Sequence, residues 1–283
     1  MQDRFRASGR VHLAADFDPG DTAGLTSKAE AKEELRLTIE RLTDYQQRLY
    51  AQNRDALLII FQAMDAAGKD SAIKHVMSGV NPQGVRVTSF KSPSDEELDH
   101  DYLWRCVRAL PQRGEIGIFN RSHYEEVLIT RVHPEILKAQ QLPPVKGSIW
   151  QRRYREINDF ERHLVDNGTH VLKFFLNVSK NEQRKRFLAR IDTPAKNWKF
   201  SAADVQERER WDDYQQAYEK MLTNTSTEYA PWYVIPADHK WFTRLAVGTI
   251  IDAELDEINP RFPTVSKAAQ EELAAARKRL EAD

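Results

Sequence analysis

One stretch decides the fold of this chain of 283 residues: positions 56–71, which read Ala56-Leu57-Leu58-Ile59-Ile60-Phe61-Gln62-Ala63-Met64-Asp65-Ala66-Ala67-Gly68-Lys69-Asp70-Ser71. Its first part is a continuous apolar run, which is typical of a strand buried in a parallel sheet. Beyond it, apolar residues return at helical spacing, at Ile73, Val76, Met77 and Val80. Between the strand and the helix lies a turn of small residues that ends in Gly-Lys. In this arrangement backbone N–H groups and a helix N-terminus point at an anion, so the stretch predicts a phosphate-binding loop.

The loop departs from the common phosphate-loop pattern in ways that concern a metal ion. The spacing to Gly68-Lys69 matches the Walker A pattern, with Ala63 in the place of the first glycine. Asp70 stands where the pattern has a Ser or Thr that binds magnesium, and a carboxylate, Asp65, lies inside the loop. Because a carboxylate beside phosphates would be repelled without a cation, we infer that Asp65 anchors Mg²⁺ instead. The alternative is an ordinary strand-to-helix turn with a surface lysine.

The rest of the chain alternates between short apolar runs and helical patterns. The further runs are Val85–Phe90, Ile116–Phe119, Val171–Leu176 and Trp232–Ile235. Continuous apolar runs joined by helices are what a parallel sheet covered on both faces requires. The sequence therefore predicts an α/β fold, a three-layer sandwich with about five parallel strands.

Smaller segments flank this alternating region. Capping boxes begin at Ser27, Ser94 and Ser179, and each predicts the start of a helix. An apolar stripe behind Ser27 predicts a helix over roughly residues 28–52. We expect an N-terminal arm and helix (1–52), a main domain (53–260) with a helical excursion over the sheet at about 177–222, and a C-terminal helix (261–283). The segments 241–258 and 266–282 are both expected to be surface helices.

A second motif follows the run at 116–119 and reads Asn120-Arg121-Ser122-His123-Tyr124-Glu125-Glu126. In open α/β sheets the ligand crevice lies beyond the carboxyl ends of the strands, so this motif and the loop should face the same crevice. Arg121 can clamp a phosphate there with its planar fork, or it can form a salt bridge that closes the sheet edge. Glu125 and Glu126 could reach a metal, its waters or a nucleobase edge, although Glu125 alone is more typical of a solvated helix face.

The charges of the chain cancel overall but are sorted along it. Positions 1–145 carry 19 basic and 21 acidic side chains, a balance of −2, whereas 146–200 carry 13 and 6 (+7) and 201–283 carry 10 and 16 (−6). The positive excess gathers in the expected excursion, where Arg184 and Arg190 lie. Such a pattern suggests that this segment meets an anion while the whole molecule stays close to neutral.

Composition excludes several classes of protein. A hydrophobic content of 41% with 30% charged residues is typical of a globular protein and not of a disordered one. No apolar run approaches the roughly 20 residues that span a bilayer, so we expect no membrane partner. With one cysteine, Cys106, no internal disulfide can form, which favours a reducing cytoplasm.

Taken together, the motifs resemble the polyphosphate kinase 2 family. The resemblance covers roughly residues 30–260 and rests on the loop, on the Asn120 motif, and on segments that begin at Phe90, His100, Trp198 and Arg210. Within that family the Asn120 motif is closer to members that phosphorylate both nucleoside monophosphates and diphosphates. The resemblance implies a P-loop kinase-like fold with a helical lid, inorganic polyphosphate as donor, AMP and ADP as acceptors with ATP as a product, and magnesium as cofactor. It also implies a homo-oligomer, often a tetramer.

The resemblance also assigns roles to residues. Asp65 is implied as the metal-organising or proton-accepting carboxylate, Lys69 as a contact of the transferred phosphoryl group, and Arg121 as a holder of phosphates beside it. Glu126 falls where family members approach the acceptor nucleotide, and we expect Asn120 to do the same. Expected phosphate contacts are Ala66, Ala67, Gly68, Asp70, Lys91, Arg184 and Arg190.

The expected reaction is attack by an acceptor phosphate oxygen on the end of a polyphosphate chain, with Lys69, Arg121 and Mg²⁺ neutralising charge. Two alternatives stay open. An ATP-dependent nucleotide kinase would use the same loop, because the loop alone does not choose the donor. A non-catalytic polyanion-binding protein would explain the basic segment but not Asp65, and we expect no nucleic-acid partner. Metal-hydrolase chemistry is disfavoured because the chain has no His-Glu-x-x-His pattern.

Overall fold

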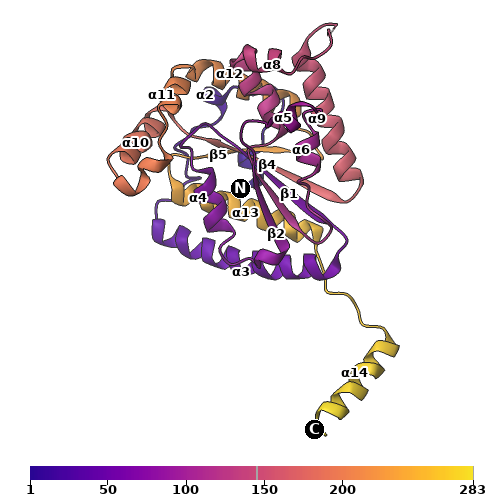
Figure 1. Cartoon of the computed structure of the whole chain (residues 1–283). Helices are drawn as coiled ribbons and strands as arrows, with labels where there is room; N and C mark the ends of the chain where they lie inside the picture. The colour runs from indigo at the N-terminus through magenta and orange to yellow at the C-terminus, as the bar shows by residue number, and fades with distance from the viewer. Residues whose placement is uncertain (145, 283) are drawn as a thin grey trace.

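A five-stranded parallel sheet forms the centre of the molecule (Figure 1). The computed structural model describes residues 1–144 and 146–282, except for the side chain of Lys199. The strands are β1 (Ala56–Gln62), β2 (Val85–Ser89), β3 (Ile116–Asn120), β4 (Thr169–Asn177) and β5 (Trp232–Pro236), in the order β2-β3-β1-β4-β5. Every neighbouring pair is parallel. The α/β fold and the strands expected from the apolar runs are confirmed.

Strand β1 lies between β3 and β4, and all its residues are buried. In the register, Phe61 of β1 pairs with Asn120 of β3, and Gln62 pairs with Phe175 of β4. The carboxyl ends of β1 and β3 therefore lie side by side. Since the loop follows β1 and the Asn120 motif ends β3, both reach the same edge of the sheet.

Helices cover both faces of the sheet. Before and around the first three strands lie α1 (Gln2–Phe5), α2 (Leu13–Asp16), α3 (Lys28–Gln52), α4 (Lys69–Val76), η1 (Pro82–Gly84), α5 (Asp95–Leu98), α6 (Trp104–Val107), η2 (His123–Val127), α7 (Ile129–Val132), α8 (Pro134–Ala139) and α9 (Ile149–Asp166). After β4 come α10 (Lys180–Ile191), η3 (Pro194–Lys199), α11 (Ala202–Glu209), α12 (Trp211–Thr225), α13 (Lys240–Ile258) and α14 (Lys267–Leu280). Helices α3, α4 and α13 lie on one side of the sheet, whereas α9 and α12 lie on the other (Figure 1).

Helix α13 is a core helix, and its expected place on the surface was wrong. Its side chains are buried along most of its length, because it lies between the sheet and α3. At Gly248 an added Cβ would lie 3.2 Å from Cδ1 of Leu35 on α3, so the small residue lets the two helices pack closely. The long apolar stripe of α3 thus packs on another helix.

The three serine caps expected from the sequence are present. Ser27 accepts a hydrogen bond from the backbone N–H of Glu30, and Ser179 accepts one from Glu182. At Ser94 the capping box is reciprocal, because Glu97 also accepts from the backbone N–H of Ser94. Each cap satisfies a helix N–H that has no partner within its helix.

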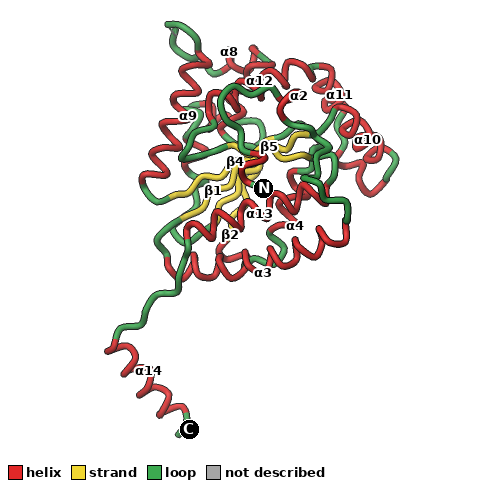
Figure 2. The backbone as a smooth tube through the Cα atoms, turned by 180° about the vertical axis from the view of Figure 1, so that it is seen from behind, coloured by secondary structure: helices red, strands yellow, loops and turns green. Residues whose placement is uncertain are grey.

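The C-terminal helix α14 stands away from the rest of the molecule. Residues 259–266 run from the end of α13 without regular secondary structure, and α14 follows them (Figure 2). Among the described residues, no helix is long and apolar enough to cross a bilayer.

Candidate active site

The phosphate loop joins β1 to α4 through two positions in the left-handed region. Ala66 has φ +62° and Gly68 has φ +112°, and α4 begins at Lys69. Only glycine adopts the second conformation without strain, which explains why Gly68 precedes the lysine. The turn brings backbone N–H groups and the N-terminus of α4 to the edge of the sheet, as expected for an anion site.

Lys69 is buried at the start of α4. Its Nζ donates to the carbonyl oxygen of Ala63 at 2.9 Å. Burial lowers the pKa of Lys69 to about 8, and the nearby Arg121 guanidinium adds to this shift, while the carboxylates of Asp65, Glu125 and Asp70 oppose it. The ammonium group therefore loses its proton at a lower pH than that of an exposed lysine, and a phosphate beside it would favour the charged form.

Arg121 links the two sheet-edge motifs. Its Nη2 donates to Oδ1 of Asp65 at 2.7 Å, and its backbone is left-handed with φ +64°. Glu125 and Asp65 raise the pKa of Arg121, while burial opposes this. Both side chains of the pair stay about a third exposed, at 37% and 33%. The salt bridge at the sheet edge is thus made to the loop carboxylate itself, where phosphate oxygens could replace it.

Two further polar residues join this group. Asn120 donates through Nδ2 to Oδ1 of Asp70 at 2.8 Å. Glu125 is half-buried, so its expected place on a solvated helix face was wrong. Burial raises its pKa, although Arg121 and Lys69 draw it down. With its nitrogen facing Glu125, the Gln62 amide donates to Glu125 Oε1 at 3.0 Å.

Helix α10 supports the loop through side chains that the sequence did not single out as site residues. Arg186 is buried and donates to the carbonyl oxygens of Ala66 and Ala67, at 3.1 and 2.6 Å. Gln183, one turn earlier, donates to the carbonyl oxygen of Asp65 at 3.0 Å. Gln183 and Arg186 are three residues apart, so they share one face of a helix that starts directly after β4, the neighbour of β1. This spacing could have identified them as loop contacts. The basic residues of α10 thus divide between an exposed face with Arg184 and an inward face with Arg186.

Three expected phosphate contacts lie outside this group. Arg184 is exposed on α10, and Lys91 is exposed after β2. Arg190 forms an ion pair with Asp204 of α11 at 3.7 Å. The side chains that bond to the loop instead include those of Asn120, Arg121, Gln183 and Arg186, so contact of Lys91, Arg184 and Arg190 with phosphate stays a prediction.

Two cavities lie on either side of the segment that carries Glu125 and Glu126. A small one, about 30 Å³, is lined by the loop and by α11 and α12, with Asp65, Arg121, Glu125, Asp204, Arg208, Tyr214 and Tyr218 among its residues. A larger one, about 300 Å³, is lined by Glu126 and by residues of α5, α6 and α9. Consecutive glutamates therefore face different cavities, one beside Asp65 and one away from it.

Glu126 is the buried acid of the larger cavity. It accepts a hydrogen bond from Gln140 Nε2 at 2.7 Å and lies 3.6 Å from Nη2 of Arg153. The Arg153 guanidinium in turn lies over the Tyr102 ring, 3.9 Å from its centroid. A cavity of this size that combines an aromatic ring with a few polar groups is typical of a small-molecule site.

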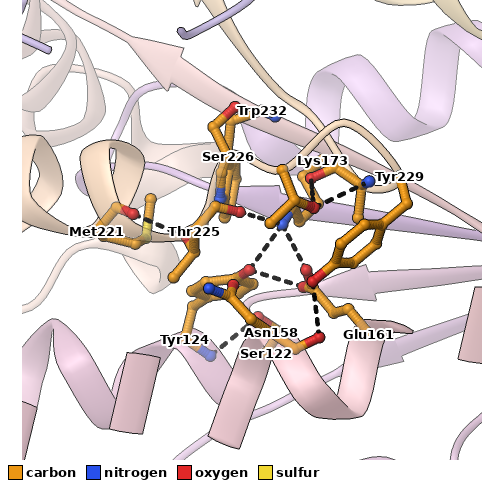
Figure 3. A network of polar contacts seen from close by, with 12 residues as sticks. Ser122, Tyr124, Asn158, Glu161, Lys173, Met221, Thr225, Ser226, Tyr229 and Trp232 are labelled. Atoms are coloured by element: carbon orange, nitrogen blue, oxygen red, sulfur yellow. Dashed lines mark hydrogen bonds and ion pairs between the residues drawn. The ribbon is translucent and has the colours of Figure 1, made fainter. Parts of the chain in front are cut away.

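A buried charged network holds η2, the segment that carries Glu125 and Glu126, against β4 and α9 (Figure 3). Lys173 of β4 and Glu161 of α9 are both 0% exposed and lie 2.5 Å apart. Tyr124 of η2 donates to Glu161 at 2.7 Å and accepts from Lys173 at 2.8 Å. Burial alone would raise the pKa of Glu161, but Lys173 and His123 outweigh it and lower that pKa. The network ties η2 to β4 and α9. It therefore holds in place the backbone that carries Arg121 and Glu126.

The residues at the loop suit one particular kind of metal. Among the described residues, no group of three His, Cys, Asp or Glu side chains is placed to hold an ion. Magnesium does not need such a cage, because it is usually bound by one or two carboxylates together with water and substrate phosphates. Asp65, partly exposed and beside the loop, fits the role of that single carboxylate.

The chain is similar to several known proteins. The family model "Polyphosphate kinase 2" matches residues 25–263. An "ADP-polyphosphate phosphotransferase" of Rhodopseudomonas palustris is 56% identical over 90% of this chain and 89% of that protein. An "AMP/ADP-polyphosphate phosphotransferase" of Meiothermus ruber is 47% identical over 94% and 97%. The crystal structure of polyphosphate kinase 2 from Arthrobacter aurescens matches with a TM-score of 0.87 and 42% identity, covering 96% of this chain and 95% of that one.

A parallel sheet whose central strand leads into a Gly-Lys loop, with an arginine and carboxylates beside the lysine, defines the class of P-loop kinase-like phosphotransferases. The match to the family model covers most of the chain, and the Arthrobacter aurescens structure has the same fold over 95% of its length. The chain belongs to the polyphosphate kinase 2 family.

Proposed function

We propose that the protein transfers phosphate from inorganic polyphosphate to AMP and to ADP, forming ADP and ATP, in a reversible reaction. The observation that carries the proposal is the Arg121–Asp65 ion pair beside buried Lys69, at the joined ends of β1 and β3. Polyphosphate as the donor is supported by the names of the relatives from R. palustris and M. ruber. Both AMP and ADP as acceptors are supported by the second of these names.

In the proposed reaction, a terminal phosphate oxygen of the acceptor attacks the terminal phosphorus of the chain, and the bond from that phosphorus to its bridging oxygen breaks. The shortened chain leaves with the electron pair of that bond. Lys69 and Arg121 balance the negative charge on the transferred group, while the loop backbone of Ala66, Ala67 and Gly68 orients it. The attacking phosphate is already anionic, so no protein base has to remove a proton.

Asp65 would hold the magnesium ion. When bound, magnesium neutralises charge on the phosphate oxygens. Arg121 would exchange part of its bond to Asp65 for a bond to phosphate, since both groups are partly exposed at the cavity. Asp70 would stay tied to Asn120, and this bond would orient the amide toward the acceptor.

We assign the acceptor nucleoside to the larger cavity, with Glu126 as its contact there, and keep Asn120, which lies beside the loop, as a contact of the rest of the acceptor nucleotide. The support is the position of Glu126, which follows Glu125 of the smaller cavity, so one nucleotide could place its phosphate beside Arg121 and its base beside Glu126. Tyr102 would supply a ring face for a base.

The basic segment is proposed to act as a lid over the donor. Of residues 177–222, α10 and α11 would form this lid, and α10 already contacts the loop through Arg186, whereas α12 is packed against the body through buried side chains. Lys91, Arg184 and Arg190 would bind the polyphosphate chain when it is present. Closure of such a segment would exclude water from the transferred phosphoryl group. We also propose that the main domain comprises residues 53–260, between an N-terminal arm and helix (1–52) and a C-terminal helix (261–283).

Two further parts of the proposal concern the whole protein. A homo-oligomer, with a tetramer as the expected form, is proposed from the family resemblance. A reducing compartment, the cytoplasm, is proposed because the one cysteine, Cys106, can form no disulfide within the chain.

One assay separates this function from its alternatives. The protein is incubated with magnesium and AMP, together with either polyphosphate or ATP, and the formation of ADP and ATP is followed. We expect turnover with polyphosphate. Turnover with ATP alone would instead indicate a nucleotide kinase, and binding of polyphosphate without turnover, unchanged in Lys69→Ala, would indicate a polyanion-binding scaffold.

A further inference from the structure

Helix α14 exposes apolar side chains with nothing of the described chain covering them. Leu273 is 61% exposed and Leu280 is 76% exposed. Both views of the molecule show the helix standing away from the body, at the end of the segment 259–266 (Figures 1 and 2). A helix of 14 residues is marginally stable alone in water. Its stability therefore calls for a partner surface.

The exposed apolar residues form one stripe. Ala269, Leu273, Ala276 and Leu280 follow one another at steps of four, three and four, the spacing that repeats in a coiled-coil seam. Large and small residues alternate along this stripe. If two such helices pack side by side in opposite directions, Leu273 of each lies opposite Ala276 of the other, and Ala269 lies opposite Leu280. Every layer then has the same volume, which lets the helices approach evenly.

The charges beside the stripe complement themselves in that same orientation. Glu272 and Arg279 flank the stripe on one side, separated by two helical turns. In an antiparallel pair, Glu272 of each helix lies opposite Arg279 of the other. In a parallel pair Glu272 would have to use Arg277, but Arg277 already donates to Glu281 of its own helix at 2.7 Å. Antiparallel packing also sets the opposite ends of the two helix dipoles beside each other.

From these observations we infer that α14 is an arm that pairs antiparallel with α14 of a second copy of this chain. The inference concerns assembly and does not rest on the proposed reaction. A pair of helices about 21 Å long buries less than the roughly 1,200–2,000 Å² of a standard interface. The arm pair is therefore one contact within a larger assembly of copies, joined to the bodies through residues 259–266.

Cysteine cross-linking tests the orientation directly in the full-length chain. Cys106 is buried, so an introduced thiol is the reactive one. When Ala269→Cys protein is mixed with Leu280→Cys protein under mild oxidation, we expect a disulfide-linked dimer of one variant with the other. Neither variant alone should cross-link, because in an antiparallel pair identical positions lie about 16 Å apart along the axis. Cross-linking of Ala269→Cys with itself, or no cross-link in the mixture, would overturn the inference.

Charge variants test the pairing independently, with sedimentation velocity across a wide range of concentration as the measurement. Glu272→Arg places like charges opposite each other, so we expect its dissociation constant for self-association to rise by roughly tenfold. The double variant Glu272→Arg with Arg279→Glu restores the opposite charges and should associate like the original chain. In a parallel pair the double variant would stay weak, because the arginine introduced at position 272 would still face Arg277.

Glu271→Arg is the matched control, since position 271 lies on the face of α14 opposite the stripe. It carries the same change of charge as Glu272→Arg and should associate like the original chain. The inference would be contradicted if the original chain were monomeric at every concentration. It would also be contradicted if Glu271→Arg and Glu272→Arg raised the dissociation constant equally.

Discussion

The Lys69 ammonium group shows how the site depends on a few charges in fixed places. It is buried beside Ala63, and its pKa is lowered to about 8 by burial and by Arg121. Around it, Asp65 forms an ion pair with Arg121, and Asp70 accepts a hydrogen bond from the neutral amide of Asn120, so both carboxylates at the edge of the sheet have a donor. A phosphate that enters would replace the ion pair of Arg121 with Asp65. Both side chains are therefore already oriented toward the place where the phosphate binds.

Removing either central charge should stop turnover without unfolding the protein. We expect Asp65→Asn and Lys69→Ala each to lower the rate of ADP formation by roughly a thousandfold or more, because the first loses the proposed magnesium ligand and the second loses a cation beside the transferred group. Circular dichroism and thermal unfolding should stay close to those of the original chain. Lys74→Ala, an exposed position on the same helix α4, is the control and should keep full activity. Near-normal rates in either site variant would contradict the assignment of the loop.

The lowered pKa of Lys69 predicts a pH dependence of donor binding. A phosphate beside the ammonium group favours its charged form, so donor binding takes up a proton once the free enzyme is deprotonated above about pH 8. The KM for polyphosphate should therefore be flat below that pH and rise above it, by at most about tenfold per pH unit. Steady-state kinetics through this window provide the measurement.

The same shift has the opposite sign for folding. The pKa of Lys69 lies below its value of 10.5 in an unfolded chain, so the unfolded state binds more protons between about 8 and 10.5, and the contribution of Lys69 to stability rises with pH there. Lys69→Arg, whose guanidinium stays charged, should remove the pH dependence of KM. A KM that does not change with pH in the original chain would argue against a role of Lys69 in donor binding.

At the scale of elements, the sequence predicted the features that depend on neighbouring residues alone. The strands follow from continuous apolar runs, and the serine caps follow from short-range spacing, so both could be predicted. The buried position of α13 could not, because its covering by α3 depends on contacts between segments about two hundred residues apart in sequence. Arg186 was hidden for the same reason, since its partners are backbone carbonyls of a distant loop, which leave no pattern in the sequence.

Arg186 of α10 should stabilise the loop more than it binds substrate. Replacing it by Met leaves the carbonyls of Ala66 and Ala67 without a buried donor, so we expect the free energy of unfolding to fall by about 3 kcal/mol. Urea denaturation measures this change. Lys185→Met, an exposed neighbour on the same helix, should change stability by less than about 0.5 kcal/mol. Equal effects of the two variants would show that the Arg186 contacts do not hold the loop.

The Lys173–Glu161 pair between β4 and α9 gives a second test at this scale. Lys173→Met removes one buried charge and leaves Glu161 unpaired, which should destabilise the fold by about 3–5 kcal/mol. Combining it with Glu161→Leu removes both charges and should recover much of that loss. Thermal unfolding of the single and double variants distinguishes the two. A double variant less stable than the single one would mean that the pair contributes net stability.

At the scale of the whole molecule, the sorted charges have a spatial counterpart. The positive excess of positions 146–200 includes α10, whose N-terminal half contacts the loop, whereas the acidic excess lies in positions 201–283. Lys69 and Arg121 at the phosphate edge are therefore joined by cations of a separate segment, of which Arg186 contacts the loop. This arrangement should favour a long anionic donor over a compact one, because many weak contacts add along a chain.

Reversing charge on α10 tests that arrangement. Arg184→Glu combined with Arg190→Glu should raise the KM for polyphosphate by roughly tenfold while the KM for AMP changes little, because the donor carries the greater charge. Steady-state kinetics with each substrate varied in turn give the comparison. Arg10→Glu with Arg113→Glu is the control, since both arginines are exposed outside this segment and the net charge changes equally. If both constants rise equally, α10 does not bind the donor.

The central place of β1 sets a condition on synthesis. Its two neighbours are β3 and β4, so neither edge of β1 is covered by the strand that follows it in the chain. During translation one of its edges stays open until residues 169–177 have left the ribosome. Pairings so distant in sequence form slowly, and an open apolar strand is prone to aggregate. The strand that leads into the phosphate loop is thus the part of a nascent chain most in need of a chaperone.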